Sequence, residues 1–332
     1  MMQRIINNPD YVVEDMVSGI EKAFSYLKLA ANNKRVLYNA SESRTKVGLV
    51  SGGGSGHEPA FLGYVGKNML DAVAIGEVFS SPTAQSFYDA FKLADHGRGV
   101  ACLFGNYAGD NMNVKMAIQM AEEDDIEVKY VVATDDVSSA PKGEEAKRHG
   151  IAGGVYMWKI AGAKASMGAS LDEVLAIAQK TVDNTRSICI GLEPCVIPAV
   201  GKANFQIEAG KMEFGIGHHG EAGSIVEDLK TAKEITNQMC KCLIDDLEVK
   251  ENEELAVLVS GLGSTPLMEQ YIVYNDVEKF LNEKSIKIWH TLVGNYVTSL
   301  DMNGVAITIL RLDEELKELL EYSAESLALV VR

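Results

Sequence analysis

Three glycine-flanked segments carry the side chains of this sequence that could bind or react with a small molecule. They are SGGGSGHEP (51–59), GNYAGD (105–110) and GIGHHGE (215–221). The first fits neither a phosphate-binding loop, which needs a Lys after the glycines, nor the spacing of a dinucleotide fingerprint or a nucleophile elbow. We interpret Gly54, Ser55 and Gly56 as a backbone nest whose amides bind an oxygen-rich ligand, with His57 at its edge. A tight turn between a strand and a helix is the alternative.

The second segment places a carboxylate after an apolar run. Gly105 follows residues 99–104, which have the pattern of a strand, and Asp110 closes the segment. Ligands of open α/β sheets bind beyond the carboxyl ends of the strands, so Asp110 is a candidate general base. The alternative is that Asp110 caps the helix that follows.

The third segment contains two adjacent histidines, His218 and His219. Such a pair suits either metal binding or a nucleophilic imidazole. The metal hypothesis is weak because no third ligand motif accompanies the pair. Since neighbouring residues of a strand point to opposite faces, we expect one of the two histidines to serve the site.

Strands and helices that alternate along the chain must position these segments. In the first half, strands are predicted for the apolar runs 47–50, 70–75, 99–104 and 128–133. In the second half, they are predicted for 187–192, 213–216, 255–260, 287–290 and 306–312. This alternation indicates an α/β fold of two domains, 1–184 and 185–332, each with a central mostly parallel or mixed sheet flanked by helices.

The composition excludes several classes of function. The 332 residues include 31 Lys and Arg against 47 Asp and Glu, a net charge of −16 that disfavours direct nucleic-acid binding. No apolar run reaches the roughly 18 residues of a transmembrane helix, and the N-terminus lacks a signal-peptide pattern. The five cysteines have no metal-site spacing and suit a reducing compartment. We expect a cytoplasmic protein that binds neither membrane nor metal.

The combination of motifs resembles the dihydroxyacetone-binding DhaK family. Five motifs match in order and spacing over nearly the whole chain: SGGGSGHEP (51–59), NYAGD (106–110), HHGE (218–221), GLGSTPLM (261–268) and GNYVTSL (294–300). The resemblance implies a homodimer whose protomers hold the substrate between two α/β domains. It also implies that a ring nitrogen of His219 adds to the ketone of dihydroxyacetone and forms a hemiaminal.

Other site roles and the partner follow from the same resemblance. His57 and Asp110 match the family's acid/base pair, the Gly54, Ser55 and Gly56 amides hold ligand oxygens, and position 105 contacts the substrate. The chain itself then binds no cofactor. A separate DhaL-type subunit carries the nucleotide, which a phosphotransferase protein recharges.

Two departures from the family pattern keep a second function open. Gly105 stands where many members have Lys, and His218 replaces a common apolar residue. A DhaQ-type branch binds dihydroxyacetone but acts as a transcriptional co-activator through a TetR-family regulator, and another branch uses four-carbon ketoses. The presence of His57, Asp110 and His219 together favours the kinase subunit, whereas the missing Lys favours the co-activator.

Overall fold

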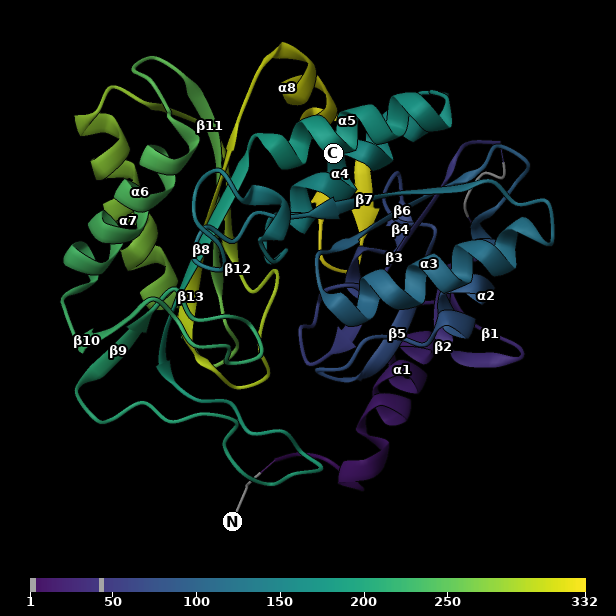
Figure 1. Ribbon diagram of the computed structural model, residues 1–332, viewed down its shortest axis with the longest axis horizontal. Coiled ribbons are helices and arrows are strands. Elements are labelled where there is room, and N and C mark those ends of the chain that lie inside the picture. Colours follow the sequence, from purple (N-terminus) through teal and green to yellow (C-terminus); the bar gives the residue numbers. More distant parts are fainter. Residues whose placement is uncertain (1–3, 42–44) are drawn as a thin grey trace.

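Two six-stranded β-sheets organise the described chain, residues 4–41 and 45–332, in this computed structural model (Figure 1). The strand order of the first sheet is β1 (Leu27–Ala30), β2 (Asn33–Asn39), β5 (Ala72–Val78), β3 (Gly48–Ser55), β6 (Val100–Gly105) and β7 (Val128–Ala133). The order of the second sheet is β10 (Ile225–Asp228), β9 (Lys211–Phe214), β8 (Thr185–Glu193), β13 (Asn303–Arg311), β11 (Glu254–Gly261) and β12 (Lys287–Gly294).

Helices cover the faces of both sheets. They are α1 (Val12–Ala23), α2 (Ala84–Ala94), α3 (Ala108–Glu122), α4 (Gly154–Ser166), α5 (Leu171–Asp183), α6 (Ala232–Leu247), α7 (Leu267–Glu283) and α8 (Glu314–Glu321). Short 3₁₀ helices span Pro9–Tyr11, Leu62–Tyr64 and Glu145–Lys147. Local sequence explains several starts: the Thr83 hydroxyl accepts the Ser86 N–H at the start of α2, and Ser170 forms a capping box with Glu173 at the start of α5.

The first sheet is parallel at its centre. Strands β5, β6 and β7 follow one another through α2 and α3, and β3 runs between β5 and β6 in the same direction. Strands β1 and β2 extend this core as antiparallel neighbours. The carboxyl ends of β3 and β6 therefore meet at one edge of the sheet, where the first two polar segments begin.

Alternation along the inner strands builds an apolar layer on each face of the first sheet. Side chains such as Val50, Cys102 and Phe104 pack in one cluster with α2 and α3. Their neighbours Leu49 and Leu103 belong to a different cluster, which includes residues of α4 and α5. Both faces of these strands are thus buried, as expected for the parallel part of an α/β sheet.

The second sheet is mostly antiparallel. Strands β9, β8, β13 and β11 pair antiparallel in turn, and β12 is parallel to β11. The chain reaches β9 and β10 from β8 without an intervening helix. Alternating sequence patterns do not reveal this direct connection. Both sheets are therefore mixed, and the predicted α/β class with mixed sheets is confirmed.

Helices α4 and α5 lie between the two sheets, whereas α6 and α7 cover the outer face of the second sheet (Figure 1). Leu103 of β6, Ile160 of α4 and Leu258 of β11 belong to one continuous apolar cluster. The end of the chain also returns to the first half, since β14 (Ala324–Ser326) pairs with β4 (Gly66–Lys67) and β15 (Val330–Val331) pairs with β14. The proposed division at 184 and 185 separates the strands of the two large sheets but not this C-terminal strand.

Within residues 4–41 and 45–332, no helix combines the length and the apolar character that crossing a membrane requires.

Candidate functional site

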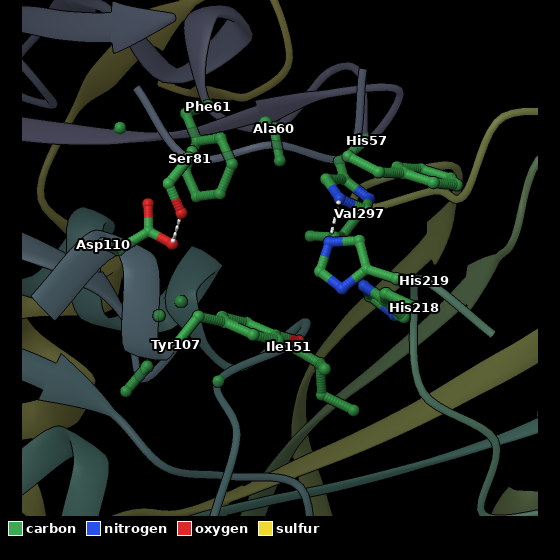
Figure 2. A pocket seen from close by; sticks show the side chains of 18 of the residues that line it. His57, Ala60, Phe61, Ser81, Tyr107, Asp110, Ile151, His218, His219 and Val297 are labelled. Atoms are coloured by element: carbon green, nitrogen blue, oxygen red, sulfur yellow. Dashed lines mark hydrogen bonds between the residues drawn. The ribbon is translucent and has the colours of Figure 1, made fainter. Parts of the chain in front are cut away.

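A cavity of about 260 Å³ lies between the carboxyl ends of β3 and β6 and the loop after β9 (Figure 2). It brings together side chains or backbone from all three polar segments. Its lining includes Gly54, His57, Phe61, Phe79, Ser81, Gly105, Tyr107, Asp110, Ile151, His218, His219 and Val297. Segments that are far apart in the sequence thus form one site.

The run of glycines belongs to strand β3, which continues to Ser55. A Cβ at Gly53 would lie 2.0 Å from the Phe61 ring, and one at Gly52 would lie 2.6 Å from the Phe87 ring. Aromatic rings therefore pack directly on the backbone, which explains why side chains are absent here. The strand ends at Ser55, and the next residue, Gly56, has a φ of +102° that suits glycine.

The residues expected to form a backbone nest have different surroundings. Gly54 lines the cavity. The Ser55 hydroxyl donates to the Gly76 carbonyl at 2.8 Å, and the Gly56 amide donates to the Glu58 carboxylate at 3.0 Å. The Ser55 hydroxyl and the Gly56 amide are therefore engaged within the protein, and of these three residues only Gly54 lines the cavity.

His57 follows β3 and is buried at the cavity wall. Its Nδ1 donates to the Thr298 carbonyl at 2.8 Å, and its ring stacks on Phe79 with the centroids 5.1 Å apart. Burial, reinforced by the neighbouring His219 and His218, holds the pKa of His57 well below its usual value of 6.5. At neutral pH this ring is uncharged and can accept a proton.

His219 faces His57 from the loop after β9. The two Nε2 atoms are 3.0 Å apart (Figure 2). Nδ1 of His219 lies 2.8 Å from Oε1 of Glu221. Burial alone would raise the pKa of the Glu221 carboxyl, but its hydrogen bonds with His219 lower that pKa to about 2. Glu221 is therefore ionised and orients the His219 ring so that Nε2 lies beside His57.

Asp110 lies in the first turn of α3, on the wall opposite the histidines (Figure 2). The Ser81 hydroxyl donates to its Oδ2 at 2.7 Å, whereas its buried Oδ1 has no hydrogen-bond partner among the described residues. Burial raises the pKa of Asp110 to about 6, against the hydrogen bond from Ser81. A carboxylate with this pKa and a free oxygen suits general-base catalysis near neutral pH.

The two departures noted in the sequence both lie at the cavity. Gly105 lines it, and among the lining residues that the structure describes there is neither Lys nor Arg. His218 is buried beside His57, with ring centroids 5.8 Å apart, and burial lowers the pKa of His218 to about 4. His219 contacts Glu221 and His57, whereas His218 contributes a neutral ring to the same cavity. Both histidines follow the end of β9 at Phe214, so the alternation of faces along a strand does not apply to them.

Sequence reasoning did not assign roles to Ser81, Tyr107, Glu221 or Thr298. Tyr107 places its ring edge-on to His219, with the centroids 5.1 Å apart. Glu221 and Tyr107 stand inside the quoted motifs. Their closeness in sequence to His219 and Asp110 was the signal that could have placed them at the site. Thr298 also stands inside a quoted motif, GNYVTSL (294–300), whereas Ser81 had no such signal because tertiary contacts alone bring it to the site. In the part of the chain that the structure describes, no cluster of His, Cys, Asp and Glu could hold a metal ion.

Comparisons with known proteins show which family and which relatives this chain resembles. The model of the Dak1 domain family matches residues 18–328. The chain is 42% identical over 322 residues to the dihydroxyacetone-binding subunit DhaK of PTS-dependent dihydroxyacetone kinase 2 of Listeria innocua, covering 96% of this chain and 97% of that protein. It is 40% identical over 313 residues to the corresponding subunit of Lactococcus lactis, with 94% of each chain covered. The solved structure of the dihydroxyacetone kinase operon co-activator DhaQ superposes with a TM-score of 0.90 at 31% identity, over 96% of this chain and 98% of that one.

Proposed function

The chain belongs to the Dak1 domain family, and on that premise we propose that it is the dihydroxyacetone-binding subunit of a PTS-dependent dihydroxyacetone kinase. One observation carries the proposal. His219, held by Glu221, and Asp110, held by Ser81, face the same cavity from opposite walls (Figure 2). This arrangement offers a nucleophile for a ketone and a base for a hydroxyl in one small space.

His219 captures the ketose covalently. Nε2 attacks the ketone carbon and the carbon–nitrogen bond forms as the carbon–oxygen π bond breaks. The oxygen takes up one proton from solvent and becomes the hydroxyl of the hemiaminal, and the substituted ring carries a positive charge beside the Glu221 carboxylate. Polyols without a carbonyl cannot react in this way, so capture selects ketoses over glycerol. The aromatic rings of Phe61, Phe79 and Tyr107 shield the reacting atoms from bulk water.

Asp110 and His57 manage the protons of the phosphoryl transfer. A hydroxymethyl group of the captured ketose lies toward Asp110, whose free Oδ1 accepts the hydroxyl proton as oxygen attacks phosphorus. His57, which is uncharged in the ligand-free protein, exchanges protons at the carbonyl oxygen of the substrate. The two groups therefore act on different oxygens of one ligand.

The phosphoryl donor comes from a partner. We propose that this chain binds no cofactor and that a DhaL-type subunit brings the nucleotide to the cavity. The absence of a phosphate-binding Lys after the glycines of β3 supports this division. The isolated chain should show no measurable ATP binding by calorimetry at millimolar nucleotide, and tight binding would contradict the scheme. The composition supports a cytoplasmic location for the complex.

A co-activator function is the second candidate. The similarity to the DhaQ structure and the lack of Lys and Arg among the described lining residues favour it. In that case the chain senses dihydroxyacetone and contacts a TetR-family regulator. The kinase subunit is the stronger proposal because identity to the kinase subunits is higher, and because a sensor has no evident use for the Ser81-held Asp110.

The second half also offers a surface for a second copy of the chain. Exposed apolar side chains gather on β10 and its following loop and at the start of α7: Ile225, Val226, Leu229, Leu267, Met268, Tyr271 and Ile272. A groove of about 220 Å³ joins them through Leu229 and Ile272. We propose that this β10–α7 surface forms the homodimer. Light scattering should give a dimer for the wild type and a monomer for Met268→Glu, with the exposed Met167→Glu as the control.

Covalent capture is the direct test of the proposed function. The wild-type protein soaked with dihydroxyacetone should show continuous density from His219 Nε2 to the ketose, and His219→Ala should show none. His96→Ala is the control for loss of a histidine outside the cavity. Free ligand beside an unmodified His219 would contradict the proposal. Turnover with a DhaL-type subunit then distinguishes the kinase, and retention of a regulator without turnover distinguishes the co-activator.

A further inference from the structure

Two lysines of helix α4 reach helix α8 in different ways. Nζ of Lys164 pairs with Oε1 of Glu315 at 3.0 Å, and the Lys164 side chain is 26% exposed. Nζ of Lys159 donates to the backbone carbonyl of Leu319 at 2.7 Å, and Lys159 is only 1% exposed. In the part of the chain that the structure describes, no carboxylate pairs with Lys159, and burial alone shifts its pKa. The Lys159 ammonium is therefore buried without a counter-charge from the protein.

A further cavity, of about 10 Å³, lies beside Lys159. Helix α4, strand β12, helix α8 and the C-terminal segment line it, so we call it the α4–β12 cavity. Its polar lining side chains are Tyr156, Lys159 and His290, and the others are Val or Leu. Among the described residues it shares no lining residue with the ligand cavity. A volume of this size accommodates about one water-sized species.

The polar side chains of the α4–β12 cavity have hydrogen-bonding capacity that the protein leaves unused. The Tyr156 hydroxyl is buried and has no hydrogen-bond partner among the described residues. Nδ1 of His290 is also buried and likewise lacks a partner there. The Lys159 ammonium has three hydrogens, and the Leu319 carbonyl accepts one of them. Because unsatisfied buried polar atoms cost free energy, these atoms favour a ligand that can bond to them.

The protonation states of these groups favour an anion as that ligand. Burial lowers the pKa of Lys159 to about 8, so the ammonium form still predominates at neutral pH. Burial raises the pKa of Tyr156 well above its usual value of 10, so its hydroxyl keeps the hydrogen. Burial, together with the charge of Lys159, lowers the pKa of His290, so its imidazole is neutral. The α4–β12 cavity therefore combines one positive charge with hydrogen donors.

We propose that Lys159, Tyr156 and His290 form a binding site for one monatomic anion of the size of chloride. The anion accepts hydrogen bonds from the ammonium, from the hydroxyl and from an imidazole that carries its hydrogen on Nδ1. A buried charge is costly unless an opposite charge lies beside it, and a small anion supplies that charge in the room available. A water molecule would fit the same room but would leave the charge uncompensated. The site is independent of the proposed function.

The proposed site connects the two halves of the chain. Lys159 and Tyr156 belong to α4, which lies between the sheets, whereas His290 belongs to β12 of the second sheet. An anion that binds only the folded protein adds to its stability by mass action. The ligand cavity uses other residues of α4, Gly154 and Trp158, so ketose capture should not require the anion.

Bromide gives the direct structural test, because it resembles chloride and has an anomalous X-ray signal. Crystals of the wild-type protein soaked in sodium bromide should show an anomalous peak within hydrogen-bond distance of Nζ of Lys159. Density without an anomalous signal at this place, which would be a water molecule, would overturn the proposal. A cavity without density would overturn it as well.

Unfolding in urea tests the site in solution. Sodium chloride is compared at equal ionic strength with sodium gluconate, whose anion is too large for the cavity. With chloride at ten times its dissociation constant, the folding equilibrium constant should rise about tenfold. Lys159→Met keeps the length of the side chain without its charge and should lose both this rise and the bromide peak. A wild type that does not respond to chloride, or an equal response of wild type and Lys159→Met, would overturn the proposal.

Lys164→Met is the matched control, because Lys164 lies on the same helix and contacts the same α8 but already has the Glu315 carboxylate. This variant should keep the chloride response and the bromide peak. If Lys159→Met does not fold, Tyr156→Phe takes its place, and the loss of one hydrogen bond to a charged ligand should weaken chloride binding roughly tenfold. Unchanged chloride binding in Tyr156→Phe would remove the hydroxyl from the site and overturn the proposal as stated.

The pH dependence of chloride binding identifies its charge partner. The titratable groups that line the cavity are Lys159, Tyr156 and His290, while α8 and the C-terminal segment contribute Leu and Val. Glu315 of α8 pairs with Lys164 and Lys180 instead. With a Lys159 pKa of about 8, chloride should bind about tenfold more weakly at pH 9 than at pH 7, as read from its effect on unfolding. Equal binding at both pH values would contradict the assignment of Lys159 as the charge of the site.

Discussion

Ser81 donates its hydroxyl hydrogen to Oδ2 of Asp110 at 2.7 Å, and this contact makes the two oxygens of one buried carboxylate unequal. Oδ1 is buried and lacks a hydrogen-bond partner in the described chain. An unsatisfied buried acceptor is costly, so a ligand hydroxyl that reaches Oδ1 gains a strong hydrogen bond. The pair thus defines which oxygen meets the substrate.

Asp110→Asn should abolish most turnover while it leaves ligand capture nearly unchanged. Asn cannot take the hydroxyl proton, and general-base catalysis contributes ~10²–10⁴-fold, whereas the hemiaminal needs His219 and His57. Turnover would be measured with a DhaL-type subunit, and capture by calorimetry. Asp172→Asn, at the exposed start of α5, is the control. Equal losses of capture and turnover would mean that Asp110 shapes the cavity instead of moving a proton.

Ser81→Ala should move the acid limb of the pH–rate profile to higher pH. The hydrogen bond from Ser81 lowers the pKa of Asp110, so its loss lets burial raise that pKa further above about 6. The base is then protonated over more of the range below neutral pH. We expect a shift of roughly one pH unit, with the rate on the plateau reduced less than in Asp110→Asn. An unchanged acid limb would show that another group sets it.

Asp110→Asn should also change how stability depends on pH. Because burial raises the pKa of Asp110 from 3.8 to about 6, the folded state binds its proton more tightly than the unfolded state. The stabilisation of the folded state by this bound proton is complete below about pH 4 and is lost as the pH rises toward 6. At pH 7 the ionised Asp110 therefore destabilises the fold, by up to about 3 kcal/mol.

Unfolding in urea at several pH values checks this sign. The stability of Asp110→Asn relative to wild type should increase between pH 4 and pH 6 and stay constant above pH 6. Asn keeps the shape of Asp and can still accept the Ser81 hydrogen bond, so the comparison isolates the charge. A constant difference across the whole range would contradict the raised pKa.

Local patterns predicted much of the site. His57, Asp110 and His219 all lie in the polar segments that follow apolar runs, and parallel or neighbouring strand ends bring such segments together. The contacts that tune them were not predictable in this way. Thr298 lies 241 residues from His57 in sequence, and Ser81 lies 29 residues from Asp110. Only the packed fold shows that these groups meet.

The fold shows the same division between local and tertiary information. The four parallel strands of the first half, β3, β5, β6 and β7, were predicted because their apolar runs are continuous, whereas β1, β2 and the short β4 were not predicted. The glycines after Val50 suggested a turn or a nest, but β3 continues through them because Phe61 and Phe87 pack where side chains would stand. The antiparallel second sheet was likewise not visible in the alternation of patterns, since strand direction depends on how the connections run.

Gly105→Lys should strengthen the binding of phosphorylated ligands to the cavity. Neither Lys nor Arg is found among the described residues that line it, so an added ammonium group would be a new charge partner for a phosphate. We expect roughly tenfold tighter binding of dihydroxyacetone phosphate, with the gain reduced at high salt and little change for dihydroxyacetone itself. Titration calorimetry at two salt concentrations would measure both.

Any side chain introduced at position 105 has a steric cost as well as its effect through charge. A second variant, Gly105→Met, separates the two effects. A Cβ there would lie 3.0 Å from the Gly150 carbonyl oxygen and 3.3 Å from the Tyr107 ring, so both variants should lose about 1–3 kcal/mol of stability. Gly105→Met has a similar length without charge and should not gain affinity for the phosphate. If the Lys and Met variants bind dihydroxyacetone phosphate equally, a lysine at 105 does not reach the ligand. The missing charge then no longer favours the co-activator over the kinase subunit. The choice between the two functions then depends only on whether the chain supports turnover that Asp110→Asn abolishes.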